Sequence, residues 1–144
     1  MAVTAKEYLS QVRIILKRLE NLNNTLEEIR GRITSTEIAY DQDRVQTSTR
    51  GDGIPAAVVR MMEVERRLSD LAARYIEIKA DVVETINMLT NVNYMTLLYK
   101  RYIELKRFEQ ISIEMGYAYQ YIINLHGWAL KAIDTIIRRR KKML

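Results

Sequence analysis

The chain has 144 residues, of which 48% are hydrophobic, with one proline, five glycines and no cysteine. This composition argues against disorder, and the absence of cysteine excludes disulfide bonds, thiolate nucleophiles and cysteine-rich zinc sites. The scarcity of helix breakers favours an all-α protein. The net charge of +5 suits nucleic acid or another anionic surface, provided that the excess is localised.

No sequence feature indicates a membrane span or an export signal. No apolar run reaches the roughly 18–20 residues of a membrane-spanning helix. The first residues, Met-Ala-Val-Thr-Ala-Lys-Glu, lack the basic-then-apolar pattern of a signal peptide. We therefore expect a soluble cytoplasmic protein without membrane contacts.

A long helix is predicted from the capping box Thr4-Ala-Lys-Glu7, a pattern in which two side chains satisfy the first backbone N–H groups. Uncharged, mostly apolar residues follow at heptad spacing, as in a coiled coil. They are Ala5, Tyr8, Val12, Ile15, Leu19, Leu22, Leu26, Ile29 and Ile33.

Residues 41–55 are predicted to form a polar loop, because Gly51, Gly53 and Pro55 fall close together in it. The tripeptide Arg50-Gly51-Asp52 resembles an integrin-binding signal, which we attribute to chance in a chain without an export signal. The loop has no other assigned role.

A second long helix is predicted after the loop, with Pro55 in its first turn. One polar residue, Thr85, interrupts its heptad series, which is Met61, Val64, Leu68, Leu71, Tyr75, Ile78, Val82, Thr85 and Leu89. The two helices are expected to fold as an antiparallel, coiled-coil-like hairpin within a region spanning residues 1–92.

The apolar stripes of the hairpin are wider than a single seam, because they also include Leu9, Leu16 and Ile86. Further helices must therefore pack against the hairpin to bury this surface. Either the C-terminal helices of the same chain or the hairpin of a second copy could do so. We favour the second copy, which would make the protein a homodimer built on a four-helix bundle. Plain core packing without a partner is the remaining interpretation.

The excess positive charge lies in the last third of the chain. Residues 94–144 hold ten lysines and arginines against four acidic residues. This concentration favours a nucleic-acid-binding domain over residues 93–144.

Residues 108–127 fit a helix-turn-helix whose turn is Gly116, since such a turn often needs a positive φ. The motif then requires apolar residues between its two helices and one small residue. The matching positions hold Ile111, Met115, Tyr117, Ile122 and Leu125, with Ser112 as the small residue. An ordinary helical corner without DNA binding satisfies the same constraints.

The same segment resembles a known family. Residues 98–117, with Arg101-Tyr-Ile-Glu104 and Glu114-Met-Gly-Tyr117, and the stretch Leu125-His-Gly-Trp-Ala-Leu130 are similar to the pattern RYxEGxSxxEIAxEMGYS…LHxxAL of sigma-factor region 4 domains. The closest variant is the phage and prophage regulator family of ArpU and RinA type. The resemblance implies a transcriptional regulator of late phage genes, in which the helical hairpin precedes a sigma region 4-like helix-turn-helix.

By this resemblance, the second motif helix begins near Ala118 and presents Tyr119, Gln120, Ile123 and Asn124 to the major groove. Amide side chains suit adenine, and an apolar side chain or Tyr ring suits the thymine methyl group. The chain departs from the family in having Ala118 where a serine usually caps the helix, and in lacking arginine on the reading face. An alternative is that Tyr119, Tyr121 and Ile123 form a docking surface for a protein such as RNA polymerase.

Several cations are predicted to contact DNA phosphates. They are Lys106, Arg107 and Lys131, and in the C-terminal tail Arg138, Arg139 and Arg140 with Lys141 and Lys142. The tail could also meet an anionic membrane surface or remain solvated.

The remaining single residues give no sign of catalysis or metal binding. His126 is the only histidine, and we expect a surface or capping role for it. Trp128 is predicted to continue a core stripe. Without a phosphate loop or an activated nucleophile, we expect a protein that is not an enzyme and takes no cofactor. The two functions left are a DNA-binding regulator and a helical adaptor that binds a protein partner.

Overall fold

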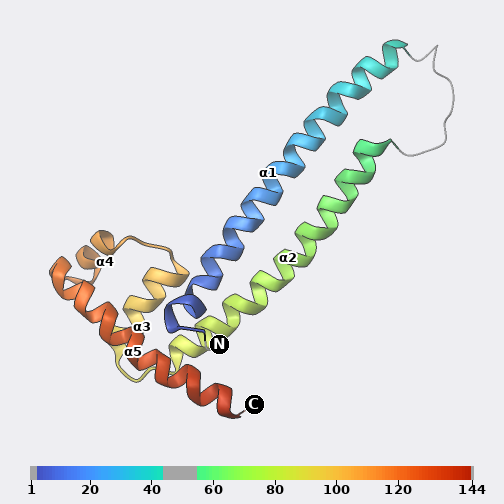
Figure 1. Ribbon diagram of the computed structural model, residues 1–144. Helices are drawn as coiled ribbons and strands as arrows, with labels where there is room; N and C mark the ends of the chain where they lie inside the picture. Colours follow the sequence, from blue (N-terminus) through green and yellow to red (C-terminus); the bar gives the residue numbers. More distant parts are fainter. Residues whose placement is uncertain (1–2, 44–54, 144) are drawn as a thin grey trace. The chain divides into compact units, whose positions relative to one another are not determined.

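The computed structural model describes residues 3–43 and 55–143, and the side chains of residues 3–34 and 55–142 (Figure 1). Every element within these residues is a helix, which confirms the predicted all-α class there. The elements are α1 (Ala5–Asp43), α2 (Ala56–Asn87), α3 (Val92–Leu98), the π-helix η1 (Tyr99–Ile103), α4 (Phe108–Met115) and α5 (Tyr119–Met143). None of the described helices is long and apolar enough to cross a membrane.

The first helix, α1, begins at the predicted capping box. The backbone N–H of Glu7 donates to Thr4 Oγ1 at 3.1 Å, and the Thr4 hydroxyl donates to Glu7 Oε1 at 3.0 Å. In a standard capping box the Glu7 carboxylate would accept from a backbone N–H, whereas here it accepts from the Thr4 hydroxyl. Either hydrogen bond holds the first turn of the helix in place.

The predicted loop boundary at residue 41 is wrong by three residues, because α1 continues to Asp43. Polar residues alone do not end a helix, and the glycines and the proline come later in the chain. Pro55 immediately precedes α2 rather than lying inside it, and its carbonyl accepts from the N–H groups of Val58 and Val59 at 3.0 and 3.2 Å. The rest of the expected loop, with the Arg50-Gly51-Asp52 tripeptide, lies outside the described residues.

The chain divides into two compact units. The hairpin unit is Lys17–Arg74, and the main unit comprises Met1–Leu16 and Tyr75–Leu144. The expected boundary between residues 92 and 93 differs from this division. The difference arises because the start of α1 and the end of α2 share a core with the C-terminal helices.

In the hairpin unit, α1 and α2 pack through their heptad positions. Leu26, Ile29 and Val64 are buried there, with Leu22, Ile33, Met61 and Leu68 packed around them. Arg30 Nη2 lies 3.1 Å from Glu65 Oε2 across the pair. Because both of these side chains are more than 40% exposed, the ion pair adds little to the apolar seam.

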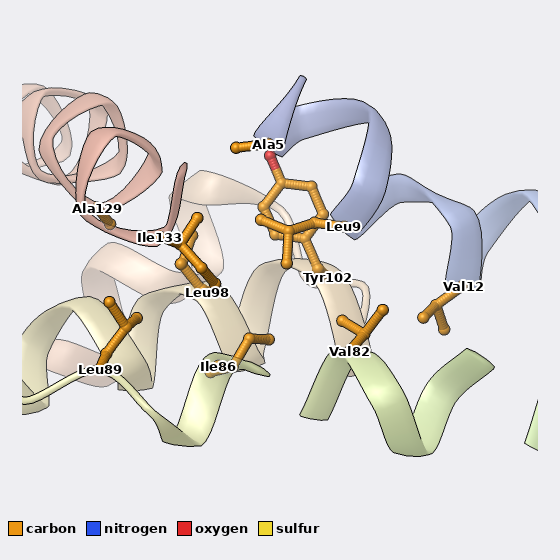
Figure 2. Packing of buried hydrophobic residues seen from close by; sticks show 10 residues of the cluster. All are labelled: Ala5, Leu9, Val12, Val82, Ile86, Leu89, Leu98, Tyr102, Ala129 and Ile133. Carbon is orange, nitrogen blue, oxygen red and sulfur yellow. The ribbon is translucent and has the colours of Figure 1, made fainter. Parts of the chain in front are cut away.

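The core of the main unit draws on five helices, and Figure 2 shows its buried side chains converging from them. The residues are Ala5, Leu9, Val12, Val82, Ile86, Leu89, Leu98, Tyr102, Ala129 and Ile133. The helices that cover α1 and α2 in this unit are therefore the chain's own, although the sequence led us to favour a second copy.

The polar residue of the second heptad series, Thr85, is the buried member of a polar cluster at the edge of the main unit, which we call the Thr85 cluster and which also contains Tyr8, Asp81 and Arg140. Its side chain is fully buried and its hydroxyl lies 2.8 Å from the Tyr8 hydroxyl. Arg140 donates to Thr85 Oγ1 and, at 3.2 Å, to Asp81 Oδ1, while the Tyr8 hydroxyl donates to Asp81. Burial, together with the hydrogen bond to Asp81, raises the pKa of Tyr8 to about 12.

The cluster changes the expected role of Arg140. This residue was predicted to contact DNA phosphate, but its guanidinium ties the end of α5 to α2. The sequence could not reveal this interaction, because 55 residues separate Arg140 from Thr85.

Candidate nucleic-acid interface

A glycine in the left-handed conformation separates α4 from α5. Gly116 has φ 75° and ψ 27°, and the N–H groups of Gly116 and Tyr117 both donate to the Ser112 carbonyl, at 3.0 and 3.1 Å. A Cβ atom added at Gly116 would meet no atom within 4 Å. Glycine is therefore needed for the backbone conformation rather than for space, as the sequence predicted.

The second helix of the pair begins where it was predicted. The carbonyl of Ala118 accepts the N–H of Ile122 at 3.1 Å, and α5 runs from Tyr119. Ala118 thus occupies the N-cap position without a side chain that could accept a hydrogen bond. Arg107 likewise precedes α4 without a side-chain cap.

Most of the constrained motif positions fill a small core between α3, α4 and α5. Ile111, Ile122 and Leu125 are buried together with Leu97, and Met115 packs against them. Tyr117 lies at the edge of this core, 38% exposed, and its hydroxyl lies 3.4 Å from the Asn93 amide nitrogen that donates to it. The small core fixes how α4 and α5 meet.

The first two turns of α5 leave the predicted reading residues at the surface. Tyr119 is 46% exposed, Gln120 and Asn124 are exposed, and Ile123 is half-buried. Gln120 Nε2 donates to Asn124 Oδ1 at 3.3 Å. This bond orients both amides and leaves Gln120 Oε1 and Asn124 Nδ2 as an acceptor and a donor, the combination that reads the edge of adenine.

The exposed face extends along α5 from this amide pair. Gln120, Asn124, Gly127 and Lys131 follow each other at helical spacing, opposite the buried Ile122. Sequence reasoning missed Gly127 as a member of this face. A Cβ atom at Gly127 would meet nothing within 4 Å, so the fold itself does not require glycine there. Because Gly127 has no side chain, the helix backbone is directly accessible at the surface between Asn124 and Lys131.

The cations predicted to contact phosphate differ in how they are engaged. Lys106 Nζ lies 2.8 Å from Glu114 Oε1 and 3.4 Å from Glu104 Oε1, so its charge is largely compensated inside the protein. Arg107 and Lys131 are exposed and make no ion pair with another described residue. These two are the better candidates for binding phosphate.

Glu114 joins the segment before α4 to α4 itself. It accepts from Lys100 Nζ at 2.7 Å and from Lys106 Nζ. These two hydrogen bonds lower the pKa of Glu114 to about 2, and the bond from Glu114 raises the pKa of Lys106. The lysines therefore position α4 rather than extend the cationic surface.

The tail cations are also unequal. Arg138 Nε lies 3.0 Å from Asp134 Oδ2, and Arg140 donates to Thr85 and Asp81. Arg139, Lys141 and Lys142 are exposed. These three carry the uncompensated charge of the tail.

His126 is half-buried and packs against two aromatic residues, whereas we expected a surface or capping role for it. Its Nε2 lies 2.8 Å from the Tyr102 hydroxyl, and its ring meets Phe108 edge-on at 4.9 Å. Burial lowers the pKa of His126 to about 4. These neighbours lie 18 and 24 residues away in sequence, so no local pattern indicated them.

Trp128 was predicted to be core, but it is 47% exposed. It belongs to a row of aromatic rings on the side of α5. Tyr117 and Tyr121 are 4.9 Å apart between ring centroids, and Tyr121 and Trp128 are 6.1 Å apart, both edge to face. The helical period places Trp128 beside Tyr121 rather than beside the buried Leu125. We call Tyr117, Tyr121 and Trp128 the aromatic row.

Leu105 is a second feature that sequence reasoning missed. It has φ 57°, the only positive φ of a non-glycine residue in the described chain. Its place in the sequence is that of the first glycine in the RYxEGxSxxE pattern. A glycine adopts this conformation without strain, whereas leucine does so at a cost of about 1–2 kcal/mol.

No protein-family model matches the chain, and comparison with curated proteins and solved structures likewise finds no match. Among the described residues, no group of three or more His, Cys, Asp or Glu side chains is placed to hold a metal ion.

Proposed function

We propose that this protein is a sequence-specific DNA-binding transcriptional regulator of the phage and prophage type that its sequence resembles. In this proposal α4, the Gly116 turn and the start of α5 form a sigma region 4-like helix-turn-helix. The observation that carries the proposal is the exposed, mutually hydrogen-bonded amide pair Gln120–Asn124, which follows a left-handed glycine at the start of a helix.

The backbone before α4 supports the same proposal. The family pattern has glycine at the position of Leu105, and Leu105 adopts a glycine-like φ of 57°. The position where the pattern has glycine is thus the position where this backbone needs a positive φ, so the match reflects backbone conformation and not only amino-acid composition. It therefore strengthens the resemblance to sigma region 4 in the segment from η1 to α5.

In the proposed mechanism, α5 enters the major groove of double-stranded DNA. Gln120 and Asn124 contact base edges there, and Tyr119 and Ile123 contact a thymine methyl group. Arg107 and Lys131 bind phosphates on either side and hold the register. The protein acts without a cofactor or catalysis, and a homodimer places two such helices roughly 10 base pairs apart or at a multiple of that spacing.

The test is to replace both amides, with Gln120→Ala and Asn124→Ala in one chain. We expect preference among DNA sequences to disappear while salt-sensitive, non-specific binding remains, because the cations that bind phosphate are kept. Competition band shifts measure the preference. Asn23→Ala with Asn24→Ala, two exposed amides on α1, is the matched control. An equal loss of affinity for all sequences would show that these amides do not read bases.

The aromatic row favours a second function, that of a helical adaptor. Tyr117, Tyr121 and Trp128 are between 37% and 47% exposed and contact one another, and exposed Tyr and Trp are enriched at protein interfaces. A protein partner such as RNA polymerase would dock on this row. Tyr121→Ala with Trp128→Ala would then abolish polymerase binding and leave DNA preference intact.

A further inference from the structure

The second helix, α2, carries an apolar face that the core of the main unit does not use. Its core side chains are Val82, Ile86 and their neighbours. On another side, Ile76 is 67% exposed, Ala80 is exposed and Val83 is half-buried. These residues line a shallow groove of about 680 Å³. Because Ile76, Ala80 and Val83 adjoin one another along one face of α2, they form a contiguous apolar strip, which is the kind of surface that meets a partner.

The spacing of this face is that of a coiled-coil seam. Ile76, Ala80, Val83 and Asn87 are separated by four, three and four residues, the alternation of d and a positions in a heptad. Lys79 and Glu84 then take the flanking g and e positions. Both line the groove, and neither makes an ion pair with another described residue. We call these six residues the α2 seam.

The charges of the α2 seam favour a second copy of this chain in parallel orientation. In a parallel pair, a g residue meets the e residue five positions later on the partner helix, so Lys79 meets Glu84 of the second copy, and the reverse pair forms by symmetry. In an antiparallel pair, g meets g and e meets e. Lys79 would then face Lys79 and Glu84 would face Glu84, which is repulsive.

Asn87 supports the parallel register. It lies at an a position, where the two copies bring the same residue together across the axis, and a single asparagine there specifies register and a two-stranded state. Toward the hairpin unit, the equivalent positions hold Ala73 and then the polar residues Ser69 and Arg66, so the apolar seam is short. A short seam predicts a dimer that dissociates on dilution.

We propose that the α2 seam is the homodimer interface, formed by two parallel α2 helices around Ile76, Ala80, Val83 and Asn87, with Lys79–Glu84 pairs between the copies. This inference rests on the proposed function, which assumes a homodimer, and it identifies the surface that forms the dimer. The seam is the available face of α2, because α1 and the chain's own C-terminal helices already occupy the core side of α2 in the main unit. Two reading helices presented by one symmetric dimer match a palindromic DNA site.

Charge reversal tests the orientation. In sedimentation equilibrium of the full chain without DNA, Lys79→Glu and Glu84→Lys alone should each weaken dimerisation by about tenfold, because attractive pairs become repulsive. The double variant should restore it. Arg18→Glu, an exposed reversal on α1, should have no effect. A monomer at all concentrations, or a dimer insensitive to both single reversals, would overturn the proposal.

Cross-linking gives an independent readout, because the chain contains no cysteine. Asn87→Cys alone and Ile76→Cys alone should each oxidise to a disulfide-linked dimer, since each residue meets its own copy in the parallel register. Cross-links that form only when the two variants are mixed would indicate an antiparallel pair and refute the assignment. A monomer that still discriminates among DNA sequences would refute the α2 seam as a dimer interface but not the DNA-reading role of α5. A dimer that responds to the charge reversals and cross-links as expected, but shows no DNA preference, would refute the DNA-reading role of α5 and leave the α2 seam.

Discussion

At the scale of single residues, Gly116 and Gly127 lie near each other in the sequence but are held in different backbone conformations. Gly116 is left-handed, whereas Gly127 is inside α5. Neither would clash through an added Cβ atom. Replacing each glycine with alanine therefore measures only the effect of the backbone conformation, since neither substitution introduces a clash.

We predict opposite effects of alanine at these two glycines. Gly116→Ala should lower the free energy of unfolding by about 1–2 kcal/mol through left-handed strain. Gly127→Ala should raise it by about 1 kcal/mol through helix propensity. Urea denaturation measures both. Stabilisation by Gly116→Ala would contradict the turn geometry.

His126 should make stability depend on pH. Its pKa is about 4 in the folded chain and near 6.5 when unfolded, so between these values the unfolded state binds more protons. The free energy of unfolding should therefore fall as the pH is lowered from 6.5 toward 4. His126→Gln keeps a polar partner for Tyr102 but does not titrate. Thermal melts across this range should show a weaker pH dependence for the variant, and identical curves would refute burial of the imidazole.

Single residues also mark where sequence reasoning stopped. The glycine turn was predictable because a left-handed φ narrows the choice of residue. The roles of Arg140 and His126 were not, because each depends on a partner from a distant helix. Trp128 was predicted to continue a core stripe, but its helical angle places it beside the exposed Tyr121.

At the scale of helices, α5 starts without a side-chain cap. Ala118→Ser should stabilise the protein by about 1 kcal/mol, because the serine hydroxyl can accept an N–H of the first turn. Chemical denaturation of the wild type and the variant measures the gain. Ala118→Val, which supplies no acceptor, is the control, and equal stability of the serine and valine variants would show that Ala118 is not an N-cap.

The end of α5 carries the exposed tail cations Arg139, Lys141 and Lys142. Replacing all three with glutamine should reduce the slope of log affinity against log salt by about 0.9 for each phosphate that the variant no longer neutralises. Sequence preference should be unchanged. Arg140→Gln should instead lower the melting temperature, because Arg140 donates to the buried Thr85 hydroxyl and to Asp81 and so ties α5 to α2. An unchanged salt slope in the triple variant would exclude the tail from DNA binding.

The heptad periodicity predicted the two long helices well. Every residue of both series is buried or half-buried where its side chain is described, because a stripe at this spacing must face a neighbour. The periodicity did not predict which helices pack against these stripes. The helices that cover the stripes in the main unit are the chain's own, and this depends on long-range packing that one sequence does not encode locally.

At the scale of the whole molecule, we propose that the protein combines a reading face on α5 with a dimer seam on α2. Both lie in the main unit, so the hairpin unit is not needed to place one relative to the other. The charge excess of residues 94–144 favours an anionic partner, and in the proposal the Gln120–Asn124 amide pair selects the base sequence.

Selection of bound sites from a random pool of double-stranded DNA by the full-length protein tests whether α5 reads a base sequence. We expect enrichment of one motif, with adenines opposite Gln120 and Asn124, repeated as half-sites roughly 10 base pairs apart or at a multiple of that spacing. A pool that stays random after repeated rounds, although the protein remains folded, would contradict it.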